Sequence, residues 1–580
     1  MKIIIIIFLL FFAFSSQAQR LNNVLFFQLP QDRQLYPRNA QNKGIIPISG
    51  RVESLGWQYL SVKVCKNNFL DSYLRMPLIY DNNGANFSAN TSIIAEKAEY
   101  SFKVYLCSNA DSTLIVTNGG GRPERAEPNS NADSTLIVTR DNVVSGDVYV
   151  LTGQSNATCL FNDTRNNEYC RTFGNITGTY NTEPYNPADT AWSLANQIPY
   201  VKNVGEFGFE IQQRITNTYN IPTCFINSGF NWSSAAQHAN RNPANPVDLT
   251  TGYGRMLYRL QKAGIVGNVK ALIYRQGETE AYGEGSDFIG NFTRFYNFIK
   301  SDLVNLSKIY VFQIDIIQFA RPDIAPVIRD DQRKLEDNYS DIHVVPSIGT
   351  IGFNGLHYSP EGYAQNALET FRLISRDFYG STDTDNIKSP NIRKAYFSKV
   401  DRKEITLEFE AGQDLSWQEQ HQGQNMVDFI YLNGISGNVQ SGIASGRRVI
   451  LQLYNSSFAT KISYLPSYVP ENASYFPYTG PFILNRRGMR AFSFYQVNLE
   501  NVPTCVATNS CCLTNESLIS GNWNEPSIWS CNRIPNSMDD TVINAGHIIS
   551  AQNDVNSVKS LMNKGVLKLG TNTMLNVKLP

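Results

Sequence analysis

The stretch Ser145-Gly-Asp-Val-Tyr-Val-Leu-Thr-Gly-Gln-Ser-Asn156 decides how the middle of this chain is interpreted. Residues 147–151 form a short apolar run rich in β-branched and aromatic side chains, which predicts a buried strand. Gly153 permits a tight turn directly after that strand. Ser155 therefore follows a strand end, where ligands bind in open α/β sheets. Serine is also a common helix N-cap, so this stretch alone leaves both interpretations open.

Two further motifs follow in order along the chain. They are Tyr274-Arg-Gln-Gly-Glu-Thr-Glu280, after a second predicted strand, and Gly352-Phe-Asn-Gly-Leu-His-Tyr-Ser-Pro-Glu-Gly362, before a predicted helix. Together with Gly-Gln-Ser-Asn they resemble the SGNH hydrolases, and most closely carbohydrate esterases of the sialate O-acetylesterase and acetylxylan esterase type. The resemblance covers roughly residues 143–380. It implies a flavodoxin-like α/β/α domain that deacetylates sugars through an acetyl-serine intermediate, with no metal and no organic cofactor.

The pattern of elements along the chain predicts several domains. Strands alternate with helical patterns over 143–385, which favours a parallel sheet covered by helices. Residues 19–142 and 386–500 show short alternating strands separated by turns, which is typical of β-sandwiches. Residues 503–580 resemble β-solenoid modules of bacterial surface proteins, and because a further coil is expected beyond Pro580, a truncated module is one interpretation.

A ten-residue sequence, SNADSTLIVT, occurs twice, at 108–117 and at 130–139. The twelve residues between the copies contain no bulky apolar side chain, so we expect a solvated loop. Two copies cannot build a solenoid, which favours a local tandem duplication in which only one copy occupies the native strand position.

The N-terminus predicts export. Lys2, the apolar run 3–14 and the small residues before position 19 are typical of a secretory signal peptide cleaved after Ala18. No later stretch approaches the ~20 apolar residues of a membrane span. The 50 basic and 50 acidic residues balance, so nothing favours a nucleic-acid partner. We therefore expect a soluble secreted or cell-surface protein whose partner is an acetylated carbohydrate.

Nine cysteines in an exported chain predict disulfides with one thiol left over. We expect Cys65 to bridge to Cys107, since both end alternating strands, and Cys159 to pair with Cys170 across a loop. A C-terminal group remains, with Cys224 as the expected free, buried thiol; the group comprises Cys505, Cys511, Cys512 and Cys531. Its spacing fits no zinc pattern.

A serine nucleophile needs a base within hydrogen-bond reach, and the chain has only five histidines. His357 stands before Ser359-Pro-Glu, an N-cap sequence that would hold it on a rigid loop at a helix start. The resemblance makes His357 the general base and acid. The competing interpretation is a surface histidine that precedes a helix.

The family usually has Asp three residues before this histidine, whereas this chain has Asn354. An amide can orient an imidazole but cannot stabilise the imidazolium, and in serine proteases the Asp-to-Asn change lowers kcat by roughly 10⁴. Glu278 could act in its place, as the resemblance suggests, or it could form a structural hydrogen bond to the nucleophile loop.

For the oxyanion and the substrate, the resemblance implies the Ser155 N–H and the Gln276 side chain as donors, with Gln154 beside them. Asn231 and Trp232 replace two glycines that normally supply a further donor. Trp232 could stack on a sugar or lie in the core. Arg275 could contact a substrate carboxylate or form a salt bridge at a domain edge.

These observations predict a secreted carbohydrate O-acetylesterase. The competing class is a catalytically impaired esterase fold, with Asn354 and the lost glycines, that binds glycans at a surface. The sequence does not distinguish between sugars and predicts no oligomeric state.

Overall fold

The computed structural model describes residues 18–108, 134–159, 165–174, 184–196, 204–283, 287–467, 477–501, 514–537, 539–552, 555–571 and 573–577. The chain divides into two compact units. The first comprises Met1–Phe312, Leu335–His343 and His357–Ser381, and the second comprises Gln313–Lys334, Val344–Leu356 and Thr382–Pro580. None of the described helices is both long enough and apolar enough to cross a membrane. The predicted signal peptide lies almost wholly outside the described residues.

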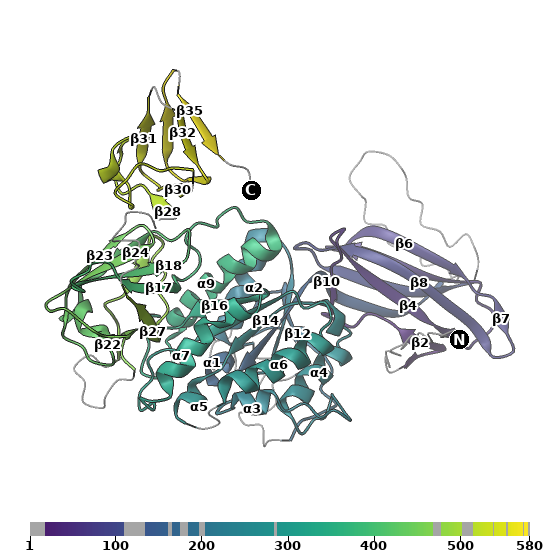
Figure 1. Ribbon diagram of the computed structural model, residues 1–580. Helices are drawn as coiled ribbons and strands as arrows, with labels where there is room; N and C mark the ends of the chain where they lie inside the picture. Colours follow the sequence, from purple (N-terminus) through teal and green to yellow (C-terminus); the bar gives the residue numbers. More distant parts are fainter. Residues whose placement is uncertain are drawn as a thin grey trace, which may run out of the picture. The chain divides into compact units, whose positions relative to one another are not determined.

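The first unit begins with two β-sheets around one core (purple in Figure 1). One sheet has the order β1-β2-β4-β8-β7, with bounds Gln19–Leu21, Val24–Gln28, Lys43–Val52, Gly84–Ile94 and Tyr80–Asp81. The other contains β5 (Tyr59–Lys66), β6 (Phe69–Pro77), β9 (Tyr100–Cys107) and the first part of β10 (Ser134–Gly153). Alternating apolar residues from both sheets, such as Ile46 and Val62, belong to this core, as the alternation in the sequence predicts.

Residues 134–139 of the second copy of the duplicated sequence lie in β10. Its residues pair antiparallel with β9, from Ser134 opposite Cys107 to Thr139 opposite Lys103. The first copy beyond Ser108 and the loop after it lie outside the described residues. The copy at 130–139 therefore provides the strand that continues toward Ser155.

The predicted disulfide Cys65–Cys107 is wrong. Strands β5 and β9 do pair, but the antiparallel register places Cys65 opposite Ser101 and Cys107 opposite Tyr59, at different ends of the ladder. Cys159 and Cys170 are also free thiols, whereas Cys224 is free and buried as expected. Cys531 is disulfide-bonded; the other three cysteines of its group lie outside the described residues.

Strand β10 runs on into a mixed sheet and carries the motif of residues 145–156 at its end. The order there is β12-β11-β13-β10-β14-β15-β16. The central pairs β13–β10, β10–β14 and β14–β15 are parallel, and the edge strand β12 is antiparallel to β11. The strand bounds in this order are Trp192–Leu194, Cys170–Phe173, Thr223–Asn227, Ser134–Gly153, Val269–Arg275, Lys308–Gln313 and Ile342–Pro346. The parallel strands bring their carboxyl ends, and the first two motifs, to one edge.

The helices between these strands pack in two groups. Helix α2 (Gly205–Tyr219) packs against α9 (Pro360–Tyr379), and the Tyr219 and Tyr379 rings stack at 4.4 Å. The second group comprises α3 (Ala235–His238), α4 (Gly252–Lys262) and α6 (Phe288–Asp302), with the short α5 (Glu278–Ala281) after β14. The alternation of strands and helices is the one that the sequence predicts over this stretch.

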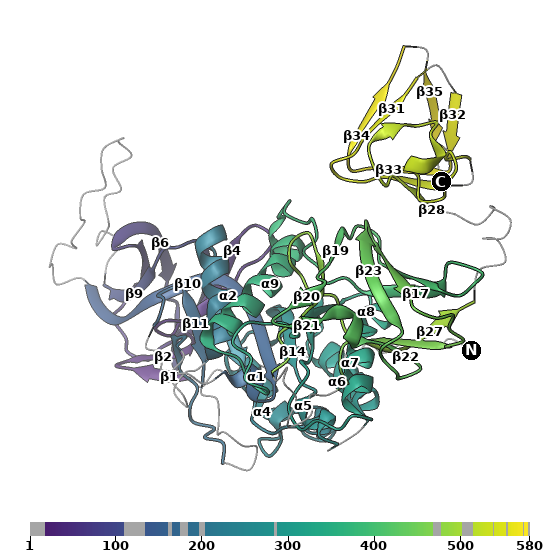
Figure 2. The same ribbon diagram turned by 90° about the vertical axis from the view of Figure 1, so that its left-hand side faces the viewer.

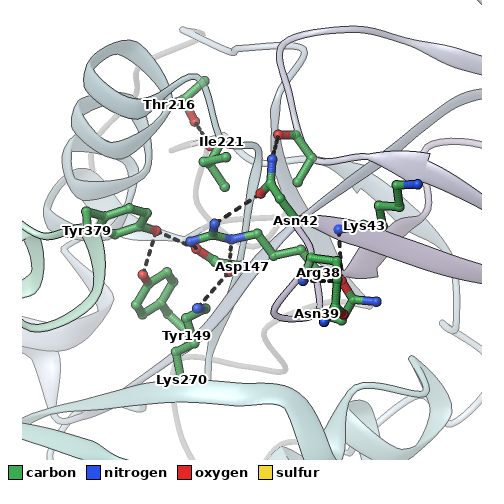
Figure 3. Close-up of polar contacts among 12 residues, drawn as sticks. Arg38, Asn39, Asn42, Lys43, Asp147, Tyr149, Thr216, Ile221, Lys270 and Tyr379 are labelled. Atoms are coloured by element: carbon green, nitrogen blue, oxygen red, sulfur yellow. Dashed lines mark hydrogen bonds and ion pairs between the residues drawn. The ribbon is translucent and has the colours of Figure 1, made fainter.

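The amino end of the β10 segment in this sheet is fixed by a buried carboxylate (Figure 3). Arg38 donates two 2.8 Å hydrogen bonds to Asp147, and Lys270 Nζ lies 3.2 Å from the same carboxylate. The Tyr379 hydroxyl donates to Asp147 (2.7 Å) and accepts from the Tyr149 hydroxyl (2.8 Å). Asp147 is 1% exposed, so these partners replace the water that its charge would otherwise require.

The second unit contains a seven-stranded sheet of order β22-β25-β27-β17-β18-β24-β23. The bounds in this order are Ile430–Leu432, Lys461–Tyr464, Phe494–Glu500, Ile392–Phe397, Glu404–Phe409, Arg448–Leu453 and Val439–Ser445. Helix α7 (Ala325–Arg333) belongs to this unit although it precedes the sheet by sixty residues or so along the chain, because its Arg329 donates to Ser493 and to Pro466 O. The hydrogen bonds of Arg329 therefore place α7 in the second unit, although the order of elements in the sequence groups it with the first.

The end of the chain forms three stacks of parallel strands (yellow in Figure 2). The stacks are β28-β30-β33, β29-β31-β34 and β32-β35. Their bounds are Thr514–Glu516, Asp540–Ile543 and Ser560–Asn563; Gly521–Asn522, Ile548–Ala551 and Val566–Leu569; and Val555–Val558 and Met574–Val577. Trp523 and Trp529 fill the interior between the strands, with ring centroids 5.0 Å apart.

Candidate active site

The turn that carries Ser155 depends on Gly153. This glycine has φ +135°, and a Cβ added to it would lie 1.9 Å from the Arg275 carbonyl oxygen. The Gln154 N–H then donates to that same carbonyl (3.0 Å), which ties the turn to the end of β14. Ser155 is the first residue of the single-turn helix α1 (Ser155–Thr158), whose N-cap is Gln154. The alternative role of Ser155 as an N-cap is therefore wrong.

His357 lies beside Ser155. Its Nε2 is 2.9 Å from Ser155 Oγ, although the two residues are 202 positions apart. The loop that holds His357 ends at Ser359, whose side chain accepts from the Gly362 N–H at the start of α9, and Pro360 is the first helical residue. Burial lowers the pKa of His357 below its usual range, so the imidazole is neutral at neutral pH and can accept a proton.

The Asn156 side chain links the three motifs. Its Oδ1 accepts from the Tyr363 hydroxyl (2.8 Å) on α9, and its Nδ2 donates to Glu278 Oε1 (2.6 Å) on α5. Asn156 thus holds the nucleophile turn at a fixed distance from the helix that follows His357. Of the two roles considered for Glu278, the structure shows the hydrogen bond to the nucleophile loop. Burial raises the pKa of Glu278.

Asn354 lies in the loop before His357 and is exposed. Its Oδ1 accepts from the Leu356 N–H at 3.1 Å. The side chain therefore stabilises the turn that leads into His357 through an oxygen, which an aspartate would also supply.

Gln276 and Gln154 are buried and bond to each other. Gln276 Nε2 lies within hydrogen-bond distance of three acceptors, Gln154 Oε1 (3.1 Å), Ser233 O (2.7 Å) and Glu280 Oε2 (3.0 Å). Gln154 Oε1 also accepts from the Thr279 N–H. Because the amide nitrogen of Gln276 is already surrounded by acceptors, its position favours a supporting role over the expected donation to an oxyanion.

Three residues that sequence reasoning did not select complete this network. Ser233 Oγ is 2.8 Å from His238 Nε2, and Glu280 Oε1 accepts from the Ala235 N–H at 2.6 Å. Burial lowers the pKa of His238 to about 3 and raises the pKa of Glu280 to about 7. The four-residue spacing of Gln276 and Glu280 across the start of α5 was the available signal, but only the fold brings Ser233 and His238 to them.

Asn231 and Trp232 lie in the loop after β13. Thr158 Oγ1 lies within hydrogen-bond distance of Ser155 O (2.9 Å) and of Asn231 Oδ1 (3.0 Å), so the loop is attached to the nucleophile turn. Trp232 is 59% exposed and has φ +56°. The interpretation of Trp232 as a core residue is therefore wrong.

Arg275 is 2% exposed, which excludes the expected contact with a substrate carboxylate. Its guanidinium donates to Asn366 Oδ1 (3.1 Å) and lies 4.2–5.8 Å from the centroids of four aromatic rings, of Phe207, Phe312, Tyr358 and Tyr363. The partners of Arg275 are thus an amide and aromatic rings. The alternative of a salt bridge at a domain edge is also wrong.

Within the described part of the chain, no three His, Cys, Asp or Glu side chains converge on a position that could hold a metal ion. The arrangement of Ser155 and His357 is that of a nucleophile with its base, the pair needed for acyl transfer.

Comparisons with known proteins find one family model and several solved structures that are similar to this chain. Residues 145–370 match the family model described as carbohydrate esterase, sialic acid-specific acetylesterase. A carbohydrate acetylesterase from Xanthomonas citri has a TM-score of 0.54 and 16% identity, with 80% of this chain and 98% of that chain covered. A protein from Arabidopsis thaliana has a TM-score of 0.32 and 17% identity, covering 40% of this chain and 99% of that chain. No curated protein matches the chain. At this identity, the Xanthomonas structure shows a shared fold.

Proposed function

We propose that this protein removes O-acetyl groups from sugars by serine catalysis, because residues 145–370 match the family model described as carbohydrate esterase, sialic acid-specific acetylesterase. One observation carries the proposal. Ser155 Oγ lies 2.9 Å from His357 Nε2, at the carboxyl end of a central strand of a largely parallel sheet. A hydroxyl at this distance from a neutral imidazole can lose its proton as it attacks an ester carbonyl.

The reaction proceeds in two acyl transfers. Ser155 Oγ bonds to the acetyl carbon while its proton passes to His357 Nε2. The former carbonyl oxygen becomes the oxyanion of a tetrahedral intermediate. The imidazolium then returns the proton to the sugar oxygen as the C–O bond breaks, leaving acetyl-Ser155. A water molecule, deprotonated by His357, attacks the acetyl carbon, and acetate leaves as Ser155 regains its proton.

In this proposal the oxyanion accepts hydrogen bonds from donors on two loops. The Ser155 N–H is at the first position of α1, where a helix leaves its N–H without an intrahelical partner. We place the Asn231 side chain as the second donor, because its contact with Thr158 attaches it to the nucleophile turn and an amide nitrogen can donate to an oxyanion. Gln276 and Gln154 support these loops from below.

Glu278 acts as a positioning residue in this proposal. Its carboxyl group accepts the Asn156 amide and is 4% exposed, so it fixes the nucleophile turn from within the protein. Asn354 occupies the sequence position of the aspartate found in the resembled esterases, and its side-chain oxygen accepts the hydrogen bond from the Leu356 N–H.

The wider proposal is a secreted enzyme, since the first eighteen residues have the pattern of an export signal. The alternative, an impaired esterase that only binds cell-surface glycans, has the replacement of Asp by Asn354 in its favour. The Ser155–His357 distance favours hydrolysis, because a binding protein has no need to keep a nucleophile within reach of its base.

The test is hydrolysis of 4-nitrophenyl acetate and of acetylated xylo-oligosaccharides by purified protein. We expect turnover by the wild type, and a loss of about 10³-fold or more in Ser155→Ala and in His357→Ala. Asp287→Ala, which removes the N-cap of α6 away from the motifs, serves as the matched control and should keep most of the activity. Equal inactivity of wild type and Ser155→Ala, with retained glycan binding, would establish the binding protein instead.

A further inference from the structure

Trp232 combines an unusual backbone conformation with an unusual exposure. Its φ of +56° lies in the left-handed region, where an L-residue with a bulky side chain pays on the order of 1 kcal/mol or more. Its indole is nevertheless 59% exposed, so no burial of the ring offsets that strain. A strained conformation of this kind persists only where the surrounding structure imposes it, and it is concentrated at functional sites.

The residues on both sides of Trp232 impose the conformation. The Phe230 N–H donates to Gly153 O (3.0 Å), and the Asn231 side chain is bonded to Thr158. After Trp232, the fully buried Ser233 contacts His238, and α3 begins with a capping box between Ser234 and Gln237. Trp232 is the exposed member of a locked segment, so its backbone has a defined position and its indole is available to a ligand.

This segment lies beside the nucleophile. Thr158 belongs to the same helical turn as Ser155 and is hydrogen-bonded to Asn231, the neighbour of Trp232. The path from Ser155 to Trp232 runs over three residues of helix, the Thr158–Asn231 side-chain hydrogen bond and one peptide unit, which places the two backbones roughly 10–15 Å apart. A ring that stacks on the indole therefore lies within a few sugar units of the ester that Ser155 attacks.

We propose that Trp232 is the stacking platform for the acetylated sugar, which makes it the residue that selects the substrate. This inference rests on the proposed function and adds the substrate class to it. An indole offers a rigid, flat apolar surface with few rotatable bonds, so stacking on it costs little conformational entropy. The matching ligand face is a pyranose whose ring substituents are equatorial, because that face presents C–H groups alone. Acetylated sugars of xylose or glucose configuration have such a face.

The test compares two esters and three variants. In Trp232→Ala and Trp232→Gly, kcat/KM for acetylated xylo-oligosaccharides should fall about tenfold, chiefly through KM, because an aromatic contact of this kind contributes about that factor. Hydrolysis of 4-nitrophenyl acetate, which carries no sugar, should stay within about twofold of wild type. Trp232→Phe should retain part of the sugar activity. Phe69→Ala, which removes an aromatic side chain that is 55% exposed on the N-terminal sandwich, is the matched control and should change neither rate.

The Gly and Ala variants also distinguish a role of Trp232 in stacking from a role in the stability of the loop. Both remove the ring, but only glycine adopts φ +56° without strain, so Trp232→Gly should melt at a temperature at or above that of Trp232→Ala. Equal losses on both esters, or unchanged kinetics with the oligosaccharide, would overturn the platform.

A binding measurement keeps this result independent of turnover. Calorimetric titration of Ser155→Ala with acetylated xylo-oligosaccharides should give a Kd that rises about tenfold when Trp232→Ala is added. If the wild type hydrolysed neither ester, the proposed function would fail, yet this difference in Kd would still support the platform. An unchanged Kd would refute the platform whatever the activity.

Discussion

The amide nitrogen of Asn156 donates a 2.6 Å hydrogen bond to Glu278 Oε1, and this contact connects the nucleophile turn to a motif 122 residues further along the chain. The same side chain accepts from Tyr363 on the helix that follows His357. The distance between nucleophile and base is therefore controlled by a buried residue that itself takes no part in proton transfer.

Glu278→Gln tests whether this contact or a catalytic charge explains the glutamate. A glutamine oxygen can accept the same bond from Asn156, so we expect kcat within about threefold of wild type. Glu278→Ala leaves the Asn156 donor unsatisfied and should destabilise the fold by about 1–3 kcal/mol. Urea unfolding and 4-nitrophenyl acetate kinetics provide both readouts. Glu361→Gln, at an exposed carboxylate of the third motif, is the control. A loss of about 10³-fold or more in Glu278→Gln would instead identify the carboxylate as a member of a catalytic triad.

The pH dependence of kcat/KM should reflect the buried environment of His357. Burial lowers the pKa of His357, and the residue must be neutral to act as a base. Activity should therefore rise with pH through an apparent pKa below about 6.5, the ordinary histidine value. The rate profile from pH 4 to pH 8, measured with 4-nitrophenyl acetate, gives this midpoint. A midpoint above the ordinary value would contradict the assignment and would indicate a carboxylate partner that raises the pKa of His357.

Asn354→Asp should make the enzyme faster. The substitution keeps an oxygen for the Leu356 N–H and places a carboxylate where the resembled esterases have their aspartate, and a carboxylate that reaches the imidazole favours the imidazolium of the transition state. We expect kcat to increase by about tenfold or more and the acidic limb of the pH profile to move to higher pH. Asn354→Ala, which removes the turn bond without adding charge, is the comparison variant. An unchanged rate in Asn354→Asp would show that another group already performs this role.

His238 should make folding stability depend on pH. Burial lowers the pKa of His238 to about 3 in the folded state, whereas the unfolded chain protonates it near 6.5. Between these values the unfolded state binds more protons, so the free energy of unfolding should fall by up to about 1.4 kcal/mol per pH unit as the pH decreases. Urea unfolding at pH 6.5, 5.5 and 4.5 (about one unit apart) should show a shallower dependence in His238→Gln than in wild type. Parallel curves would mean that His238 is protonated in the folded protein.

Asp147→Asn should destabilise the protein strongly. The carboxylate is 1% exposed and faces both Arg38 and Lys270, so its loss leaves two cations without their buried counter-charge. Breaking a buried pair in this way costs about 3–5 kcal/mol. Asp81→Asn breaks the exposed Arg51–Asp81 pair, which should change stability by less than about 1 kcal/mol. Comparable small effects of the two substitutions in thermal unfolding would show that the Arg38 cluster is open to water.

The sequence by itself determined the strand and turn before Ser155, the N-cap and proline that start α9, and the order of three motifs within the segment that matches the esterase family model. These are local properties, since strand periodicity, glycine turns and helix caps depend on residues a few positions apart.

Only the tertiary structure decided which distant residues come into contact. The register of β5 and β9 separates Cys65 from Cys107, and burial removes Arg275 from the substrate. Folding also brings His238 and Ser233 beneath Gln276, and it holds Trp232 outward on a left-handed backbone. The physical reason is that register, burial and side-chain direction arise from contacts between residues tens to hundreds of positions apart, and no local pattern specifies them.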